Sequence, residues 1–367
     1  MQKKLIALAL ASAFAAPAFA ATSNVDIFGQ MNVSVDMLKG KSLAPATGNK
    51  SQMNVSSNAS FIGFKGAEDL GGGLKAIWEL KTYVSLGGTG TSDTGISTDS
   101  FVNGNAFAGL SSGMGTVVLG KMEGPMKLVG RKVDLFNNTL GDVRNFSLGF
   151  DTRPNNTIAY MSPDMAGFQA TVAYVTNMDV NYGLLGTTVL NGATTNNSVN
   201  AWSGSATYTN GPLFVGLGYE RHNLSRPDSV PATTEDEKDM RVAAGYTFSG
   251  FKLVGMYEKG KDLKGVNGSD RTVYGLGGAY NFGASTIKAQ WYKAGKLNGA
   301  TDTGANMWAV GYDYAMSKRT IGYVGYAKTN NDAQAAFSAF GGGHGDNPGT
   351  VKGLDPSGFT VGMIHNF

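Results

Sequence analysis

The chain contains no cysteine and three histidines, and these two scarcities exclude several kinds of chemistry. Without thiols there are neither disulfide bonds nor thiolate metal sites. No two of the histidines, His222, His344 and His365, have a spacing typical of metal ligands, so we expect no metal and no cofactor. A hydrolase that uses Ser, His and Asp would have to rely on His222 as its base, and an enzymatic function is therefore not expected.

Long apolar runs are also missing beyond the start of the chain. Residues 1–4 include two lysines, residues 5–16 are apolar, and residues 17–20 end in Ala-Phe-Ala. This pattern predicts a signal peptide at 1–20 and an exported mature domain at 21–367, because the apolar core is too short for a membrane helix. No later window reaches the roughly 18 apolar residues that such a helix needs.

Proline is scarce, with ten residues, whereas there are 53 glycines. This ratio, together with many tyrosines and phenylalanines, is typical of strands joined by turns. Loss of 1–20 removes two lysines and no acid, which leaves 28 basic against 27 acidic residues, so no nucleic-acid partner is expected. An exported chain without a membrane helix can still cross a membrane with strands.

One unit recurs along the chain: a strand, a tight turn, a strand and a longer polar loop. Tight turns are predicted at 69–73, 112–115, 163–167, 209–212, 248–250, 282–284 and 316–319. Long loops are predicted near 39–50, 87–100, 121–153, 177–199, 223–238, 261–270, 295–304 and 330–357. Seven turns and eight loops predict an all-β fold, a sixteen-stranded antiparallel transmembrane β-barrel with both chain ends on the turn side.

The strands alternate between two kinds of side chain. Leu74 and Leu80 fall on one face of their strand, whereas Lys75 and Lys81 fall on the other. A soluble β-sandwich would alternate too. The position of the aromatic residues favours the barrel, because they gather beside the turns, where a girdle would meet lipid headgroups. They are Tyr246, Phe248, Tyr280, Phe282, Tyr312, Tyr314 and Phe367.

The segment 121–153 does not alternate, although its neighbours on both sides do. It combines both signs of charge with apolar residues, and long irregular segments in compact all-strand proteins are usually functional or disordered. We predict that it folds into the lumen and sets the width and the charge of the hole. Its acidic candidates are Glu123, Asp134 and Asp142, and its basic candidates are Lys127, Arg131, Lys132 and Arg144.

Strand parity predicts which charges of the wall face the lumen. A lysine or arginine facing lipid near mid-membrane would cost about 2–4 kcal/mol, so the charged face of each strand should be the inner one. The predicted set is Lys65, Lys75, Glu79, Lys81, Arg241, Lys252, Glu258, Arg271 and Lys288. Opposed charges would create a field across the hole. The alternative is that several of them pair with one another and pin the loop to the wall.

Segments of family-like sequence are spread along the mature chain, at 25–29, 60–76, 106–110, 115–120, 162–163, 166–168, 316–320 and 361–367. In these segments the chain resembles the general diffusion porins of Gram-negative bacteria, in the branch typical of β-proteobacteria and Neisseria. The resemblance implies a homotrimer in the cell outer membrane, surrounded by lipid and lipopolysaccharide, with 121–153 as the third extracellular loop. It also implies that the terminal Phe367 is recognised by the barrel-assembly machinery.

Four inward positions depart from this branch, in which arginine or other polar residues are frequent. They are Phe61, Val118, Ala159 and Ile364. Because rings of side-chain charge set pore selectivity, a strong anion preference is not expected. The leading hypothesis is a water-filled channel for passive diffusion of small hydrophilic solutes and ions. The alternatives are a substrate-biased channel, for amino acids or dicarboxylates, and a soluble secreted β-sandwich binding protein.

Overall fold

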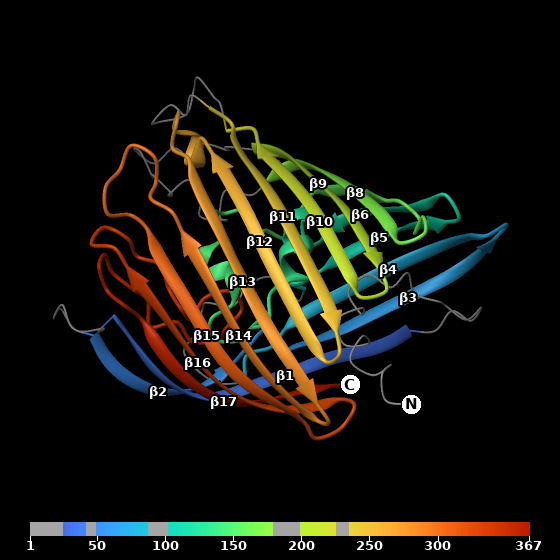
Figure 1. Cartoon of the computed structure of the whole chain (residues 1–367). Helices are drawn as coiled ribbons and strands as arrows, with labels where there is room; N and C mark the ends of the chain where they lie inside the picture. Colours follow the sequence, from blue (N-terminus) through green and yellow to red (C-terminus); the bar gives the residue numbers. More distant parts are fainter. Residues whose placement is uncertain (1–24, 42–48, 87–101, 179–198, 225–234) are drawn as a thin grey trace, which may run out of the picture.

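The computed structural model describes residues 25–41, 49–86, 102–178, 199–224 and 235–367. The predicted signal peptide lies outside these ranges, and so do large parts of the predicted loops at 39–50, 87–100, 177–199 and 223–238. The described strands form one sheet in which each strand pairs antiparallel with its neighbours. The first and last strands also pair with each other, from Gln30 with Asn366 to Lys39 with Ser357, and this pairing closes the barrel (Figure 1).

The described elements follow one another in simple up-and-down order. The strands are β1 (Val25–Lys41), β2 (Asn49–Ser57), β3 (Phe61–Gly71), β4 (Leu74–Tyr83), β5 (Ala106–Ser112), β6 (Gly115–Lys121), β7 (Thr157–Met161), β8 (Phe168–Met178), β9 (Val199–Asn210), β10 (Leu213–His222), β11 (Glu237–Phe248), β12 (Phe251–Lys261), β13 (Arg271–Phe282), β14 (Ser285–Ala294), β15 (Ala305–Ala315), β16 (Thr320–Asn331) and β17 (Ser357–Asn366). The helical segments are α1 (Pro125–Arg131), η2 (Val143–Phe146) and η4 (Leu263–Gly265).

Strands β2 and β3 are two halves of one barrel strand. Both pair with β1, and the interruption between them spans residues 58–60. Ala59 there has a positive φ of 50°, so the ladder is broken, and the backbone N–H of Asn58 instead donates to the carbonyl of Asn32. Counted as one, the two halves bring the barrel to sixteen strands, and the predicted fold class is confirmed.

The two rims of the barrel differ as the sequence predicts. Tight turns connect the strands at one rim, and Gly72 and Gly73 in the first of them adopt the positive φ values that favour glycine. Gly29 and Phe367 exchange backbone hydrogen bonds at this rim, so both described chain ends lie there. The longer connections, including 122–156 and 332–356, lie at the other rim.

The outer face of the strands is apolar and carries an aromatic girdle. On β13, for example, Tyr274 and Leu276 are exposed on the outer face. Val273, on the inner face of the same strand, is fully buried. Phe248, Phe251, Tyr280 and Phe282 form a continuous row of rings near the turn rim, with centroids 4.3–5.7 Å apart. This arrangement matches the predicted lipid-facing belt. Within the described ranges, no helix has the length and apolarity that a membrane crossing requires.

The segment that follows β6 turns into the barrel. Helix α1 lies against the inner faces of β9, β10 and β11, and it is visible inside the ring of strands in Figure 1. The predicted inward third loop is therefore confirmed.

Candidate functional site

The inward loop packs its apolar side against the wall of the barrel. Pro125 starts α1, where its missing N–H costs no hydrogen bond. Val129, Val133 and Phe146 are fully buried against inward side chains of β11 to β15. Some of these wall residues are alanines, such as Ala243, Ala294 and Ala305, and they leave room for the loop between larger side chains such as Tyr292. Because each buried apolar side chain contributes about 1.5–3 kcal/mol, the contact holds the loop inside the barrel.

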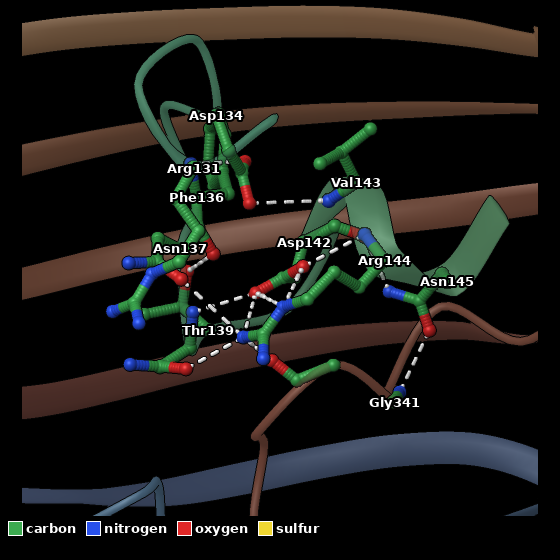
Figure 2. Close-up of polar contacts among 12 residues, drawn as sticks. Arg131, Asp134, Phe136, Asn137, Thr139, Asp142, Val143, Arg144, Asn145 and Gly341 are labelled. Carbon is green, nitrogen blue, oxygen red and sulfur yellow. Dashed lines mark hydrogen bonds and ion pairs between the residues drawn. The ribbon is translucent and has the colours of Figure 1, made fainter. Parts of the chain in front are cut away.

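An internal polar network fixes the shape of the loop (Figure 2). Asp142 accepts hydrogen bonds from the backbone N–H of Asn138 at 2.8 Å and of Arg144 at 2.8 Å. The Arg144 guanidinium returns to Asp142, with Nη2 2.6 Å from Oδ2. Arg144 also donates to the Asn138 side chain and to the carbonyl of Gly342 in the eighth loop. Asp142 and Arg144 therefore neutralise each other while they tie two loops together.

Asp134 is a second buried carboxylate of the loop. It accepts from the backbone N–H of Phe136 at 2.9 Å and of Val143 at 3.2 Å, and from Gln290 Nε2 on β14 at 3.1 Å. Burial raises the pKa of Asp134 to about 8, and the negative charge of Asp142 adds to that effect. Asp134 is therefore mostly protonated at neutral pH and adds little charge to the interior.

Glu123, the third acidic candidate, lies among three cations. Its carboxylate is 3.3 Å from Lys127 Nζ, 2.6 Å from Arg131 Nη1 and 3.0 Å from Arg153 Nη2. Burial alone would raise the pKa of Glu123, but these cations, led by Arg131, hold it well below its usual range. Burial lowers the pKa of Lys127 to about 7 despite the nearby carboxylate. The cluster therefore keeps an excess of positive charge.

Arg241 on β11 anchors both ends of the loop. Its guanidinium makes a bidentate ion pair with Asp151, at 2.6 and 3.0 Å, and donates to the backbone carbonyl of Met126 at 3.2 Å. Glu258 on β12 supplies a second carboxylate, 2.7 Å from Nη2. Arg241 is 1% exposed, so this predicted wall charge lies beneath the loop and not on an open surface.

The other predicted wall residues fall into two groups. Six inward cations are partly exposed and have no carboxylate of the described residues within 4 Å; they are the loop residue Lys132 and the wall residues Lys65, Lys75, Lys81, Lys252 and Arg271. Glu79 is also partly exposed, and Asn105 donates to it at 3.0 Å. Lys288 is instead paired with Asp313 at 2.8 Å, and its Nζ lies over the ring of Phe136.

The apolar inward positions are also divided. Val118 and Ala159 pair across β6 and β7 and are buried in a cluster with Met122, so they do not line an open surface. Ile364 is partly exposed on β17. Phe61 is partly exposed on β3 beneath the ammonium of Lys81, which lies 3.6 Å from the ring centroid. The roles of all these residues in selectivity stay predictions.

Histidine lies in buried structural pairs at two described positions. His222 contacts Glu220 at 2.8 Å and Glu237 at 2.7 Å and is fully buried. His344, from the eighth loop, lies 3.0 Å from Asp36 on β1. His222, the base that a hydrolase would need, is thus held between two carboxylates away from any open surface.

Sequence reasoning missed the inward part of the eighth loop. Phe340 is fully buried with Leu38 and Leu140, so this part of 332–356 packs against the third loop. Its glycine-rich composition is typical of a polar connection, and Phe337 and Phe340 are the apolar residues that indicate otherwise. Arg153, Tyr83 and Phe28 were also missed. The parity of Lys75 and Lys81 would have placed Tyr83 on the inner face.

Comparisons with known proteins agree with this architecture. The family model described as Gram-negative porin matches residues 7–334. The chain is 28% identical to outer membrane porin protein 32 of Delftia acidovorans over 383 residues, with all of both chains covered. It is 30% identical to major outer membrane protein P.IB of Neisseria gonorrhoeae, with 88% of this chain and 92% of the relative covered.

A solved structure with a similar fold is the anion-selective porin from Comamonas acidovorans. It superposes with a TM-score of 0.73 at 25% identity and covers 94% of this chain and 100% of its own. With the family match over most of the sequence and a closed sixteen-stranded barrel, the chain belongs to the Gram-negative porin family and is an outer-membrane channel for the passive diffusion of small hydrophilic solutes.

Proposed function

We propose that the channel filters solutes where the inward loop meets the basic wall, and that it passes anions with a modest preference over cations. The observation that carries this proposal is the difference in accessibility between the two signs of charge. The inward cations Lys65, Lys81 and Lys252 are partly exposed, whereas the loop acids Glu123 and Asp142 are buried in ion pairs. Permeating ions therefore meet more positive than negative charge.

Neighbouring cations add their charges to the positive field. Lys132 on the loop lies close enough to Lys252 on β12 for the two charges to interact. Arg131 is one of three cations around a single carboxylate, that of Glu123. A passing anion relieves the repulsion between such charges, while a passing cation adds to it. The low-dielectric wall makes this difference larger than it would be in water.

The preference stays modest because four inward positions that often carry polar or basic residues in this branch are apolar here. Val118 and Ala159 are buried, and Phe61 and Ile364 present apolar surface. The solved relative described as anion-selective supports the sign of the preference but not its size.

The homotrimer, contacts with lipid and lipopolysaccharide, and recognition of Phe367 by the assembly machinery belong to the same proposal. Family membership supports them. Phe367 is exposed at the turn rim, next to the closing pair of strands, and is therefore accessible to an assembly factor in the folded chain. Cross-linking of the protein in outer-membrane fragments tests the trimer, and its absence from the cross-linked products would contradict it.

The charge filter is tested by planar-bilayer recording of the purified protein in a tenfold KCl gradient. We expect chloride to permeate faster than potassium, with a chloride-to-potassium permeability ratio of about 2–5, and the sign of the reversal potential to reflect this. The double variant Lys65→Gln, Lys252→Gln should bring the ratio toward one. A cation preference of the unaltered protein would overturn the proposal.

A further inference from the structure

A row of aromatic rings and lysines lies on the inner wall of β1, β3 and β4, outside the buried apolar clusters that pack against the loop. Phe28, Phe61 and Tyr83 form this row, with ring centroids 5.9 Å and 6.2 Å apart and interplanar angles of 68° and 72°. The two lysines above it are Lys65 and Lys81. We name these five residues the aromatic-lysine patch.

The sheet register places all the rings on the inner face. Phe61 pairs directly with Tyr83, and Phe28 pairs with Gly63. A Cβ added at Gly63 would lie 2.5 Å from Phe28 Cζ, so the outer end of the Phe28 ring lies over this glycine. Because Gly63 has no side chain, the Phe28 ring can lie in this space and extend the aromatic surface along the wall. All three rings are partly exposed.

The lysines of the patch lie over aromatic rings, while Asp26 and Glu79, the cross-strand partners of Lys65, are the nearest acidic positions in the sheet register. Lys81 Nζ lies 3.6 Å from the ring centroid of Phe61 and 5.0 Å from that of Tyr83, and Lys65 Nζ lies 5.2 Å from that of Phe28. Within the described part of the chain, neither ammonium has a carboxylate within 4 Å. Cation-π contact compensates an ammonium charge partly, so both groups retain affinity for an anion.

Geometry and charge together select a class of ligand. An inorganic anion would pair with the ammonium groups and make no use of the rings, and a small aliphatic carboxylate would use them poorly. A planar aromatic ring packs on such rings edge-to-face or offset, and its carboxylate can reach an ammonium at the same time. We propose that the aromatic-lysine patch is a binding site for aromatic monocarboxylates that pass through the channel.

This proposal rests on the proposed basic filter for delivery of the anion, and it adds a preference within the class of anions. The guanidinium of Arg153 borders the patch, 5.0 Å from the ring of Tyr83, and donates to the Tyr83 hydroxyl at 2.5 Å. Because Arg153 also pairs with Glu123, the patch adjoins the cation cluster of the loop. A bound aromatic acid would therefore narrow the ion path at the filter.

The test is chloride current through single channels in planar bilayers at pH 7.5 and 0.1 M KCl, where screening is limited. The probes are benzoate and cyclohexanecarboxylate, which have the same charge and similar size. We expect benzoate to halve the current at a concentration about three- to tenfold lower than cyclohexanecarboxylate. Equal half-blocking concentrations would overturn the proposal.

Variants separate the patch from the general field of the bore. Phe61→Leu keeps an apolar side chain and should abolish the difference between the two acids, with each block measured relative to the variant's own current in KCl alone. Lys252→Gln, on the far wall, removes the same charge as Lys81→Gln. Lys252→Gln should leave the ratio of the two half-blocking concentrations unchanged. Lys81→Gln should raise the concentration of benzoate that halves the current. If Phe61→Leu fails to assemble, Phe28→Leu takes its place. A ratio that survives both aromatic substitutions contradicts the proposal.

The KCl gradient is recorded in the same membranes before either acid is added. A cation preference there would overturn the basic filter, and the ratio of the two acids would still decide the patch.

Discussion

Arg241 and Asp151 form a bidentate ion pair, at 2.6 and 3.0 Å, that joins the inner wall of β11 to the last residues of the inward loop. The same guanidinium donates a hydrogen bond to the backbone carbonyl of Met126, near the opposite end of the loop. One wall side chain thus holds a segment of about thirty residues at both ends. The apolar side of the loop adds the burial of Val129 and Phe146.

Replacing Arg241 with methionine should loosen this anchor. The substitution leaves Asp151 and Glu258 buried without their cation, and breaking such a pair costs about 3–5 kcal/mol. We expect a lower thermal midpoint, measured by the change in gel mobility on heating, and noisier single-channel currents. Arg221→Met is the matched control, because Arg221 pairs with Asp236 but is 45% exposed; the expected loss is about 0–1 kcal/mol. Equal losses of stability in the two variants would contradict the role of Arg241 as the anchor of the loop.

The barrel itself was predictable because its sequence signals are local. A period of two places Tyr274 and Leu276 on one face and Val273 on the other, and turn residues such as Gly72 and Gly73 mark the rim. The inward loop was predictable because 121–153 breaks that period. The outward girdle was predictable from aromatic residues next to the turns.

Partner choice inside the barrel was not predictable in the same way. Parity places Arg241 on the inner face, but it does not say that Asp151, 90 residues away, will cover it. The contact between Asp36 and His344 likewise joins the two ends of the chain. Composition suggested a solvent-exposed eighth loop, whereas Phe340 buries part of it. Such contacts depend on how two irregular segments fit together, and no sequence period records that fit.

A pH effect follows from Asp134. Its pKa is about 8 in the folded loop, against 3.8 for the ordinary group, so between about pH 4 and 8 the folded state binds more protons than the unfolded state. The contribution of protonated Asp134 to the free energy of unfolding is complete below pH 3.8 and is lost as the pH rises through about 8. We expect the free energy of unfolding of the protein to fall by about 2–4 kcal/mol across this window relative to Asp134→Asn, measured by urea titration at several pH values. Parallel pH profiles of the two proteins would contradict it.

The buried acids also make a prediction about selectivity. Because Asp134 is mostly protonated at pH 7, Asp134→Asn should leave the reversal potential in a KCl gradient unchanged. Asp142→Asn removes the charge that neutralises Arg144, so it should shift the potential toward anions. Neutralising Asp134 and Asp142 together should then shift it by the amount seen for Asp142 alone. No shift in the double variant would mean that the charges of this network do not reach the ion path.

The eighth loop should matter for the width of the channel as much as for stability. Phe340 is fully buried against Leu38 and Leu140, and its truncation to alanine leaves a cavity that costs about 3–5 kcal/mol. Because Gly341 and Gly342 next to it bind Asn145 and Arg144 of the third loop, the cavity should also release that loop. We expect Phe340→Ala to lower the thermal midpoint and to raise the single-channel conductance or its noise.

Val351→Ala is the control for this last experiment. Val351 lies in the same loop and is exposed, so its truncation should change neither the thermal midpoint nor the conductance nor its noise. A lower midpoint with unchanged conductance and noise would mean that the eighth loop supports the barrel without shaping the bore. Unchanged values of all three would contradict the buried position of Phe340. A rise in conductance in Phe340→Ala alone would show that two loops, packed against each other, determine the width of the ion path.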